Sequence, residues 1–343
     1  MPKWKVRPEG SNWGEFGEDD QLGRMNLLTA RRRIAAIREA REGIAFCLSL
    51  PLDYPGGPGQ TPSRMPPRSE PTRRPSGELN CSYPFSKLNP KFKDIVSDDK
   101  FTICMQYSTH WDALTHWGQE FDADGDGVAE PVYYNGHAAK DYVLGPDQQG
   151  ETADRKMFSR RLGLDTLAVA CAQGRGVLVD LYSIFGEAPE AVGYDQLMKA
   201  FERQKVVVEP GDFLCLYTGW ADLVMNMKGS PDATRLKNAC VALDGGDSAL
   251  LKWISDSGIV AICADNEGVE HLRSVASGVG GHTALPLHEL CLFKLGVFLG
   301  EMWHFGEIAS WLRAHERNRF LLTAPPLRMP GCVGSPTVPV GTV

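Results

Sequence analysis

The chain has no apolar run long enough to cross a lipid bilayer among its 343 residues. Its first seven residues, Met1 to Arg7, also lack the apolar core that a signal peptide needs. We therefore expect a cytoplasmic protein that does not bind membranes.

Basic residues are also fewer than acidic residues. The chain carries 36 lysines and arginines against 43 aspartates and glutamates, which gives a formal net charge of −7. Nonspecific binding to nucleic acid needs a basic surface. We therefore expect a small-molecule substrate and no nucleic-acid partner.

Paired cysteines and common nucleophile motifs are also missing. The nine cysteines are spread singly, with no Cys-x-x-Cys pair, so neither a zinc knuckle nor a disulfide framework is expected. Cys215 and Cys263 lie inside apolar, strand-like runs and are predicted to be buried thiols. No Gly-x-Ser-x-Gly elbow and no P-loop occurs, so neither serine-nucleophile nor nucleotide chemistry has a recognisable motif.

The most informative segment that is present runs Gln106-Tyr-Ser-Thr-His-Trp-Asp-Ala-Leu-Thr-His116. Alternate side chains of an extended strand point the same way. Gln106, Ser108, His110 and Asp112 are therefore expected on one face, with His116 just beyond, in a loop. An imidazole and a carboxylate two residues apart can bind one divalent ion, and a second imidazole can move protons. A strand with a polar solvent face is the other interpretation, and the spacing alone leaves both open.

This segment resembles the signature His-x-Gly-Thr-His-x-Asp-x-x-x-His of the metal-dependent cyclase-like hydrolases. That superfamily includes bacterial kynurenine formamidase and isatin hydrolase. Other segments resemble the family in the same order along the chain: Asp20 to Thr29, Gly176 to Asp180, Pro286 to Leu290, and Ala324 to Pro336. The shared order carries the resemblance, which covers most of the chain.

The resemblance implies one divalent metal ion, Zn²⁺ or Mn²⁺, held by His110, Asp112, His288 and Glu301. The family's first metal-binding histidine falls at Gln106, whose amide is a neutral and weaker zinc ligand than imidazole. Either Gln106 ligates a harder ion such as manganese, or the other four residues hold a single ion. Glu301 lies thirteen residues after His288, one more than in the formamidase pattern.

The implied activity is hydrolytic. A metal-dependent hydrolase of this kind would open a C–N or C–O acyl bond in a cyclic amide or imide, a formamide or a lactone. The substrate would be small and aromatic or cyclic, and the attacking group would be a water molecule activated by the metal. His116 would move the proton, and Trp13, at a family position near the substrate entrance, would stack on a flat substrate.

Two other functions remain open at this stage. The same metal site could serve a cyclase or dehydratase of a secondary metabolite. Alternatively, the change to Gln106 could have removed metal binding and left a non-catalytic small-molecule-binding protein. The family's assemblies further imply a homodimer or a homotetramer.

The pattern of helices and strands predicts one α/β domain spanning residues 1–343. The resemblance implies a small closed or swivelling β-structure of the β/β/α type, flanked by helices. Thr29 caps and Gly43 ends a predicted helix over 27–42. The remaining predicted elements are strands over 44–50, 101–107, 176–181, 212–217 and 258–264 and helices over 194–204, 247–256 and 287–295.

Two irregular segments complete the prediction. Proline, glycine and arginine are dense from Pro51 to Pro75, which argues against regular structure. A loop or arm at about 51–77 is expected, as a plain surface loop, a lid over the site or an arm on a partner subunit. Asp122 to Gly127 imitates the start of a calcium-binding loop, but Tyr133 stands where the bidentate glutamate is required, which favours a tight acidic turn.

Overall fold

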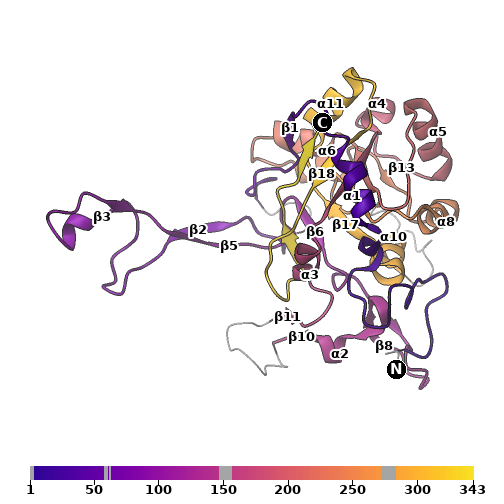
Figure 1. Cartoon of the computed structure of the whole chain (residues 1–343), viewed down its shortest axis with the longest axis horizontal. Helices are drawn as coiled ribbons and strands as arrows, with labels where there is room; N and C mark the ends of the chain where they lie inside the picture. The colour runs from indigo at the N-terminus through magenta and orange to yellow at the C-terminus, as the bar shows by residue number, and fades with distance from the viewer. Residues whose placement is uncertain (1–3, 58–60, 62, 147–156, 272–282) are drawn as a thin grey trace.

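A mixed sheet of nine strands forms the centre of the molecule (Figure 1). The computed structural model describes residues 4–57, 61, 63–146, 157–271 and 283–343. In spatial order the strands are β1 (Ala45–Cys47), β20 (Val340–Thr342), β18 (Arg319–Thr323), β12 (Gln173–Asp180), β14 (Phe213–Tyr217), β16 (Ala261–Ala264), β17 (Phe298–Glu301), β6 (His110–Asp112) and β19 (Gly334–Pro336).

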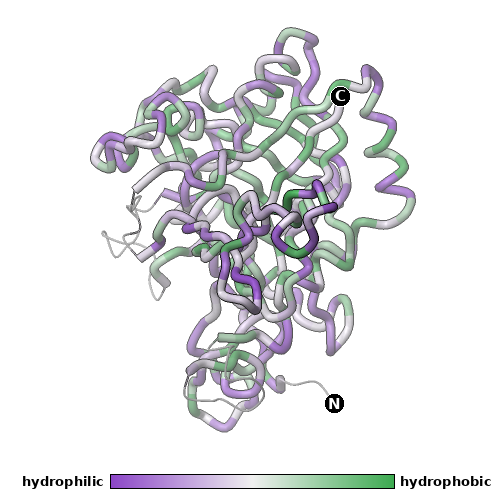
Figure 2. The backbone as a smooth tube through the Cα atoms, turned by 90° about the vertical axis from the view of Figure 1, so that its left-hand side faces the viewer, coloured by the Kyte–Doolittle hydropathy of each residue, from purple (hydrophilic) through white to green (hydrophobic). Residues whose placement is uncertain are grey.

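Four neighbouring strands, β12, β14, β16 and β17, run parallel and form the middle of the sheet. Every residue of β14, β16 and β17 is buried, as expected for parallel strands covered on both faces. The apolar runs of β12, β14 and β16 account for the prediction of strands over 176–181, 212–217 and 258–264, of which the last begins three residues later than predicted. Figure 2 shows hydrophobic segments running through the middle of the body. The α/β prediction is confirmed.

Helices flank this sheet. The main ones are α1 (Ala30–Ile37), α5 (Tyr194–Gln204), α6 (Trp220–Asn226), α8 (Ser248–Ser257) and α11 (Gly306–Ala314). The predicted boundaries of α5 are confirmed, and those of α8 differ by one residue at each end. Asp247 caps α8 and also accepts the backbone N–H of Tyr194, so one carboxylate joins the starts of two helices.

The predicted cap of helix α1 is confirmed, because the Thr29 side chain accepts a hydrogen bond from the backbone of Arg32, but the helix begins at Ala30 and not at residue 27. Its predicted end at residue 42 is wrong. The backbone N–H groups of Glu42 and Gly43 donate to the carbonyl of Val343 at the C-terminus. A distant segment therefore satisfies these groups, and the helix stops at Ile37.

The predicted strand over 101–107 is also wrong. Strand β5 (Asp99–Thr102) ends early, β6 starts only at His110, and the residues between them form turns and bends. The hydroxyl of Tyr107 bonds with the backbone of Gly56 and Gly57, so the proline-rich loop holds this stretch away from a sheet. Gln106 and Ser108 therefore precede the strand of His110 and do not lie on it.

A long arm, residues 66–103, projects from the body (Figure 1). Its stem pairs β2 (Arg68–Pro71) with β5 in antiparallel register, and its head contains β3 (Tyr83–Pro84), the short helix η2 (Phe85–Lys87) and β4 (Ile95–Val96). Strand β2 corrects the prediction that regular structure is excluded between Pro51 and Pro75. Its partner strand comes about thirty residues later, and no local pattern reveals that pairing.

The smaller elements complete the body. They are η1 (Gly23–Leu27), β7 (Gln119–Phe121), β8 (Glu130–Tyr133), η3 (Tyr134–Gly136), β9 (His137–Ala138), α2 (Ala139–Tyr142), β10 (Val143–Leu144), β11 (Phe158–Ser159), α3 (Leu164–Val169), α4 (Tyr182–Phe185), β13 (Ala191–Val192), α7 (Ala233–Lys237), β15 (Ala242–Leu243), α10 (Pro286–His288) and the π-helical η4 (Glu289–Leu295). Within the described ranges, no helix has the length and apolar character needed to span a membrane.

Candidate metal centre

Two neighbouring antiparallel strands bring three predicted metal ligands together. Strand β6 presents His110 and Asp112 two residues apart, so both side chains lie on one face of the sheet. Glu301, the last residue of β17, is the direct cross-strand partner of His110. Because directly opposed residues share a face, the sheet register itself assembles His110, Asp112 and Glu301.

The ligand atoms of these residues lie within 4.8 Å of one another, in the buried interior. Nε2 of His110 is 3.5 Å from an oxygen of Asp112 and 3.5 Å from an oxygen of Glu301. The other ring nitrogen, Nδ1, lies 2.7 Å from the carbonyl oxygen of Ser108. That carbonyl can only accept, so Nδ1 carries the hydrogen when the ring is neutral and the Nε2 lone pair faces the carboxylates.

Several atoms of this cluster have no hydrogen-bond partner within the described part of the chain. They are Nε2 of His110, both carboxylate oxygens of Asp112 and Oε1 of Glu301. A buried carboxylate without hydrogen bonds or a counter-charge is strongly destabilising. A divalent cation between these atoms would supply the missing interactions, so the residues present fit a metal ion.

His288 completes the predicted set from a different element. It is the last residue of α10, and its Nε2 lies 3.4 Å from Oε1 of Glu301. Its Nδ1 lies 2.7 Å from Oε1 of Glu270, and the same carboxylate accepts the backbone N–H groups of Leu287 and His288. Glu270 therefore fixes both the ring and the start of the helix that carries it.

The shifted pKa values show how strongly the cluster attracts positive charge. Burial lowers the pKa of His110, but the carboxylates of Asp112 and Glu301 outweigh burial and raise it to about 10. Burial likewise lowers the pKa of His288, and Glu270 and Glu301 raise it to about 10. Burial raises the pKa of Glu301, but the two imidazoles hold it well below its usual range. Without an ion, bound protons balance the carboxylates, and a divalent cation can take their place.

His116, the predicted proton carrier, lies at the edge of the cluster with 21% of its side chain exposed. Its Nε2 is 3.6 Å from an oxygen of Asp112. Burial lowers the pKa of His116 and outweighs the attraction of the nearby carboxylates. The ring is therefore neutral at neutral pH and able to accept a proton.

Gln106 lies beside His116, in the turn before β6. Its amide nitrogen is 3.5 Å from Nδ1 of His116. Gly334 on β19 makes room for it, because a Cβ at that position would come 2.1 Å from the same amide nitrogen. Metal ligation by Gln106 stays a prediction, and its position next to the proton carrier is the structural finding.

The structure places Trp13 in the core, with none of its surface exposed. The indole N–H donates to the carbonyl of Phe293 at 2.8 Å, and the ring meets Phe293 and Phe121 edge-on. This position does not agree with the predicted stacking on a substrate. The aromatic ring beside the ligands is instead the partly buried Trp117, whose centroid lies 5.4 Å from that of His288.

Part of the proline-rich loop lies next to the cluster. The hydroxyl of Thr61 donates to Glu267 at 2.9 Å, and Arg64 donates to the carbonyl of Gln106 at 3.3 Å. Burial raises the pKa of Glu267, whose charged neighbours include Glu301 and Arg64. Thr61 and Arg64 therefore contact residues near the site, whereas residues 66–103 form the arm, and the role of a lid stays a prediction.

Glu270 and Glu267 were missed in the sequence. They lie three and six residues after β16, in the segment that leaves the carboxyl end of this parallel strand. In open α/β sheets ligands gather at such ends. Their position in the segment after a predicted strand is the signal that could have identified both residues.

Two other polar clusters lie elsewhere. The carboxylates of Asp122, Asp124 and Asp126 come close enough to hold an ion, but they already accept backbone N–H groups of residues 125–128. This arrangement matches the predicted tight acidic turn.

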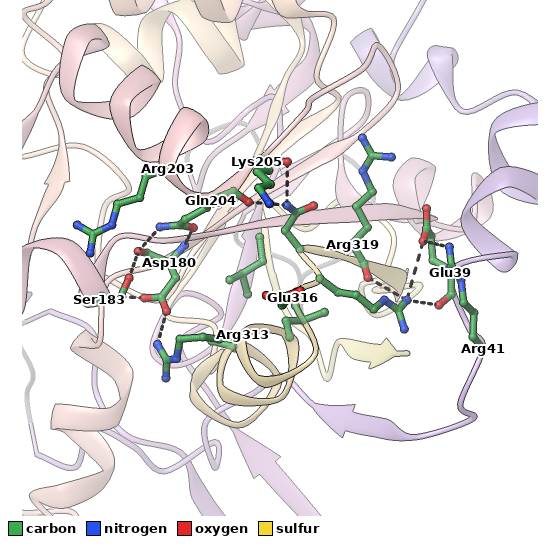
Figure 3. A pocket seen from close by; sticks show the side chains of 15 residues that line it. Glu39, Arg41, Asp180, Ser183, Arg203, Gln204, Lys205, Arg313, Glu316 and Arg319 are labelled. Atoms are coloured by element: carbon green, nitrogen blue, oxygen red, sulfur yellow. Dashed lines mark hydrogen bonds and ion pairs between the residues drawn. The ribbon is translucent and has the colours of Figure 1, made fainter.

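A hollow of about 600 Å³ is lined by cations at the ends of α5 and α11, but by none of the predicted metal ligands (Figure 3). Arg313 pairs with Asp180, and Arg317 donates to the backbone carbonyl of Glu39. Cations near helix C-termini offset the helix dipole, so these side chains have structural tasks.

Known proteins resemble this chain over much of its length. Residues 61–271 match the family described as "Putative cyclase". A crystal structure described as a novel cyclase is 28% identical, covers 98% of this chain and 100% of its own, and superposes with a TM-score of 0.75.

Two further structures share the fold at low identity. Isatin hydrolase A from Ralstonia solanacearum is 14% identical, covers 91% of this chain and 97% of its own, and has a TM-score of 0.56. Isatin hydrolase A from Labrenzia aggregata, bound to benzyl benzoate, is 13% identical, covers 88% and 93%, and has a TM-score of 0.54. No protein with a curated description matches the chain.

Proposed function

Because this chain belongs to the cyclase family, we propose that it is a metal-dependent hydrolase that opens a C–N or C–O acyl bond of a small aromatic or cyclic substrate. The observation that carries the proposal is the group of buried, unpartnered atoms of His110, Asp112 and Glu301, with the neutral imidazole of His116 beside them. Hydrolases with the same fold, including the isatin hydrolases, add support for the reaction class.

His110, Asp112, Glu301 and His288 would hold the ion. Two imidazoles and two carboxylates form a mixed nitrogen and oxygen set that suits Zn²⁺ or Mn²⁺. When bound, such an ion lowers the pKa of a water molecule and polarises an acyl oxygen.

The proposed role of His116 is to accept the proton of the attacking water and pass it to the leaving nitrogen or oxygen. Asp112, 3.6 Å from Nε2 of His116, would stabilise the imidazolium formed on the way. Gln106, next to the other ring nitrogen, would limit rotation of the imidazole. Trp117 would form an aromatic wall near His288.

The test combines metal content with activity. Wild type, His110→Ala and His116→Gln are purified side by side, analysed by elemental mass spectrometry and assayed with cyclic amides, cyclic imides, formamides and lactones. We expect about one equivalent of ion in wild type and in His116→Gln, and far less in His110→Ala. We also expect His116→Gln to lose about 100-fold or more in kcat. Wild type that neither retains nor binds zinc or manganese would refute the proposal.

A further inference from the structure

Glu267 is a carboxylate beside the candidate metal centre to which the proposed function gives no role. Its side chain is mostly buried, and one of its oxygens accepts a hydrogen bond from the hydroxyl of Thr61 at 2.9 Å. The charges of Glu301 and His110 both act on it, so it lies near two of the predicted ligands. Its second oxygen has no hydrogen-bond partner among the described residues. That oxygen can accept a hydrogen bond from a ligand.

A carboxylate in such a position needs a counter-charge. Among the described residues that act on Glu267, the permanent cation is Arg64. No ion pair joins these two side chains within the described ranges, and the guanidinium donates instead to the carbonyl of Gln106 at 3.3 Å. Burial outweighs the attraction of Arg64 and raises the pKa of Glu267. Arg64 therefore compensates this carboxylate in part.

The charges around the centre as a whole also lack positive charge. Four carboxylates lie in it or beside it: Asp112, Glu301, Glu270 and Glu267. Against them stand one divalent ion, when bound, and the guanidinium of Arg64, because imidazoles that ligate a metal are neutral. One negative charge is left without a counterpart. Such a site attracts a cationic ligand and repels an anionic one.

We propose that Glu267 binds a cationic nitrogen group of the substrate, such as an ammonium. The second oxygen of Glu267 accepts an N–H of this group in a charge-assisted hydrogen bond, and the positive charge completes the balance of the site. The inference rests on the proposed function and narrows its substrate to a small aromatic or cyclic acyl compound that also carries a cation. Glu267 is thus a substrate-binding residue, and the proton transfer proposed for His116 is unaffected.

The other role open to Glu267 is structural, because it holds the proline-rich loop through Thr61. Two substitutions separate the roles. Glu267→Gln keeps an acceptor for Thr61 and removes the charge, whereas Thr61→Val keeps the charge and removes the bond to the loop. Glu307→Gln, which removes one negative charge from an exposed position on α11, is the matched control.

The test measures binding of substituted acetophenones to the zinc- or manganese-loaded protein by isothermal titration calorimetry. A ketone offers the carbonyl of an acyl substrate but no bond to hydrolyse. The probes carry an aminomethyl, an ethyl or a carboxylate group at the meta or para position. In wild type we expect the better aminomethyl probe to bind about tenfold or more tightly than its ethyl counterpart, and the carboxylate probes to bind most weakly.

Glu267→Gln should reduce this preference to about twofold or less, whereas Thr61→Val and Glu307→Gln should retain it. Equal binding of aminomethyl and ethyl probes to wild type, or no binding of any probe, would overturn the proposal. A preference that survives in Glu267→Gln, or that Thr61→Val abolishes equally, would overturn it too. Circular dichroism confirms that each variant is folded.

Metal content and hydrolysis, measured on the same preparations, keep this inference apart from the proposed function. Protein that binds the ion and hydrolyses neutral formamides or lactones, but shows no preference for aminomethyl probes, retains the proposed function and overturns the role of Glu267. Protein that takes up no ion, but prefers aminomethyl probes through Glu267, refutes the metal-dependent hydrolase and supports the cation site.

Discussion

At the scale of single residues, the candidate metal centre depends on side chains that are not themselves predicted ligands. Glu270 is the clearest case, because one carboxylate accepts from the ring of His288 and from two backbone N–H groups. A carboxylate behind a ligating histidine orients the ring and raises its basicity. The position of His288 thus rests on a residue eighteen places earlier in the chain.

Replacing Glu270 should weaken metal binding without unfolding the protein. Glu270→Gln keeps the shape but removes the charge, so we expect affinity for zinc or manganese to fall about tenfold, and Glu270→Ala to lose up to about 100-fold. Affinity is measured by competition with a chromophoric chelator. Glu289→Gln is the control, since Glu289 is buried on the adjoining helix and pairs with Lys294. Equal affinities for Glu270→Gln and wild type would contradict the role.

Trp13, which was predicted to meet the substrate, belongs to the core. Trp13→Phe removes the N–H that satisfies the Phe293 carbonyl and leaves a gap beside η4. We expect the free energy of unfolding to fall by about 1–3 kcal/mol, with metal content unchanged. Chemical denaturation measures the first and elemental analysis the second. An unchanged stability together with a raised KM would instead support stacking on the substrate.

At the scale of elements, a polar cluster joins α6 to the start of α11. Asp222 on α6 accepts from the hydroxyl of Tyr217 at 2.6 Å and lies 2.8 Å from Nε2 of His304. The hydrogen bond to Asp222 raises the pKa of His304. Burial raises the pKa of Asp222, but the hydrogen bonds from His304 and Tyr217 outweigh burial and lower it. The contribution of His304 to stability is therefore lost at high pH, and that of Asp222 is lost at low pH.

The pair should stabilise the protein most between about pH 4 and pH 6.5. The contribution of His304 is complete below its ordinary pKa of about 6.5 and disappears as pH rises through the raised value. The contribution of Asp222 is present above about pH 4 and disappears as pH falls through the lowered value.

The difference in unfolding free energy between wild type and His304→Gln should be about 1 kcal/mol near pH 6, allowing for the partial exposure of Asp222. It should shrink by pH 9. Denaturant titrations at the two pH values measure it, and a difference that grows towards pH 9 would contradict this account.

At the scale of the whole molecule, the sheet carries the candidate site and the loops around it define its surroundings. The predicted ligands come from β6, β17 and α10, so the candidate site depends on the assembled core. Thr61 and Arg64 of the proline-rich loop contact residues near it, and the arm projects outward from the body. Figure 2, viewed with the arm towards the reader, shows hydrophilic and hydrophobic segments mixed along the foreground loops.

Removing the ion should lower the stability of the entire fold, because Asp112 and Glu301 lie in the buried interior. We expect chelator-treated protein to unfold at a lower temperature and added zinc or manganese to restore it. At a free ion concentration 100 times Kd, the ion contributes about 2.7 kcal/mol. Differential scanning calorimetry with and without each ion measures the shift. The same melting temperature under all conditions would contradict a resident metal ion.

Much of the framework could be predicted from the sequence. Apolar runs in β12, β14 and β16 and the cap at Thr29 are local patterns with local physical causes, and so they were predicted correctly. The pair His110 and Asp112 was identified by its spacing and by the resemblance of the surrounding signature. The cyclase family was likewise recognisable from the order of such segments, and the match over residues 61–271 confirms it.

Tertiary structure alone decided the rest. The pairing of His110 with Glu301 depends on sheet register, and the support of His288 by Glu270 depends on how the end of β16 meets α10. The arm depends on pairing between β2 and β5. The burial of Trp13 depends on packing against Phe293. Each of these joins residues far apart in the chain, and the free energy of such contacts is realised only after the core has assembled. Local sequence therefore determined which side chains were available, and long-range packing determined which of them meet.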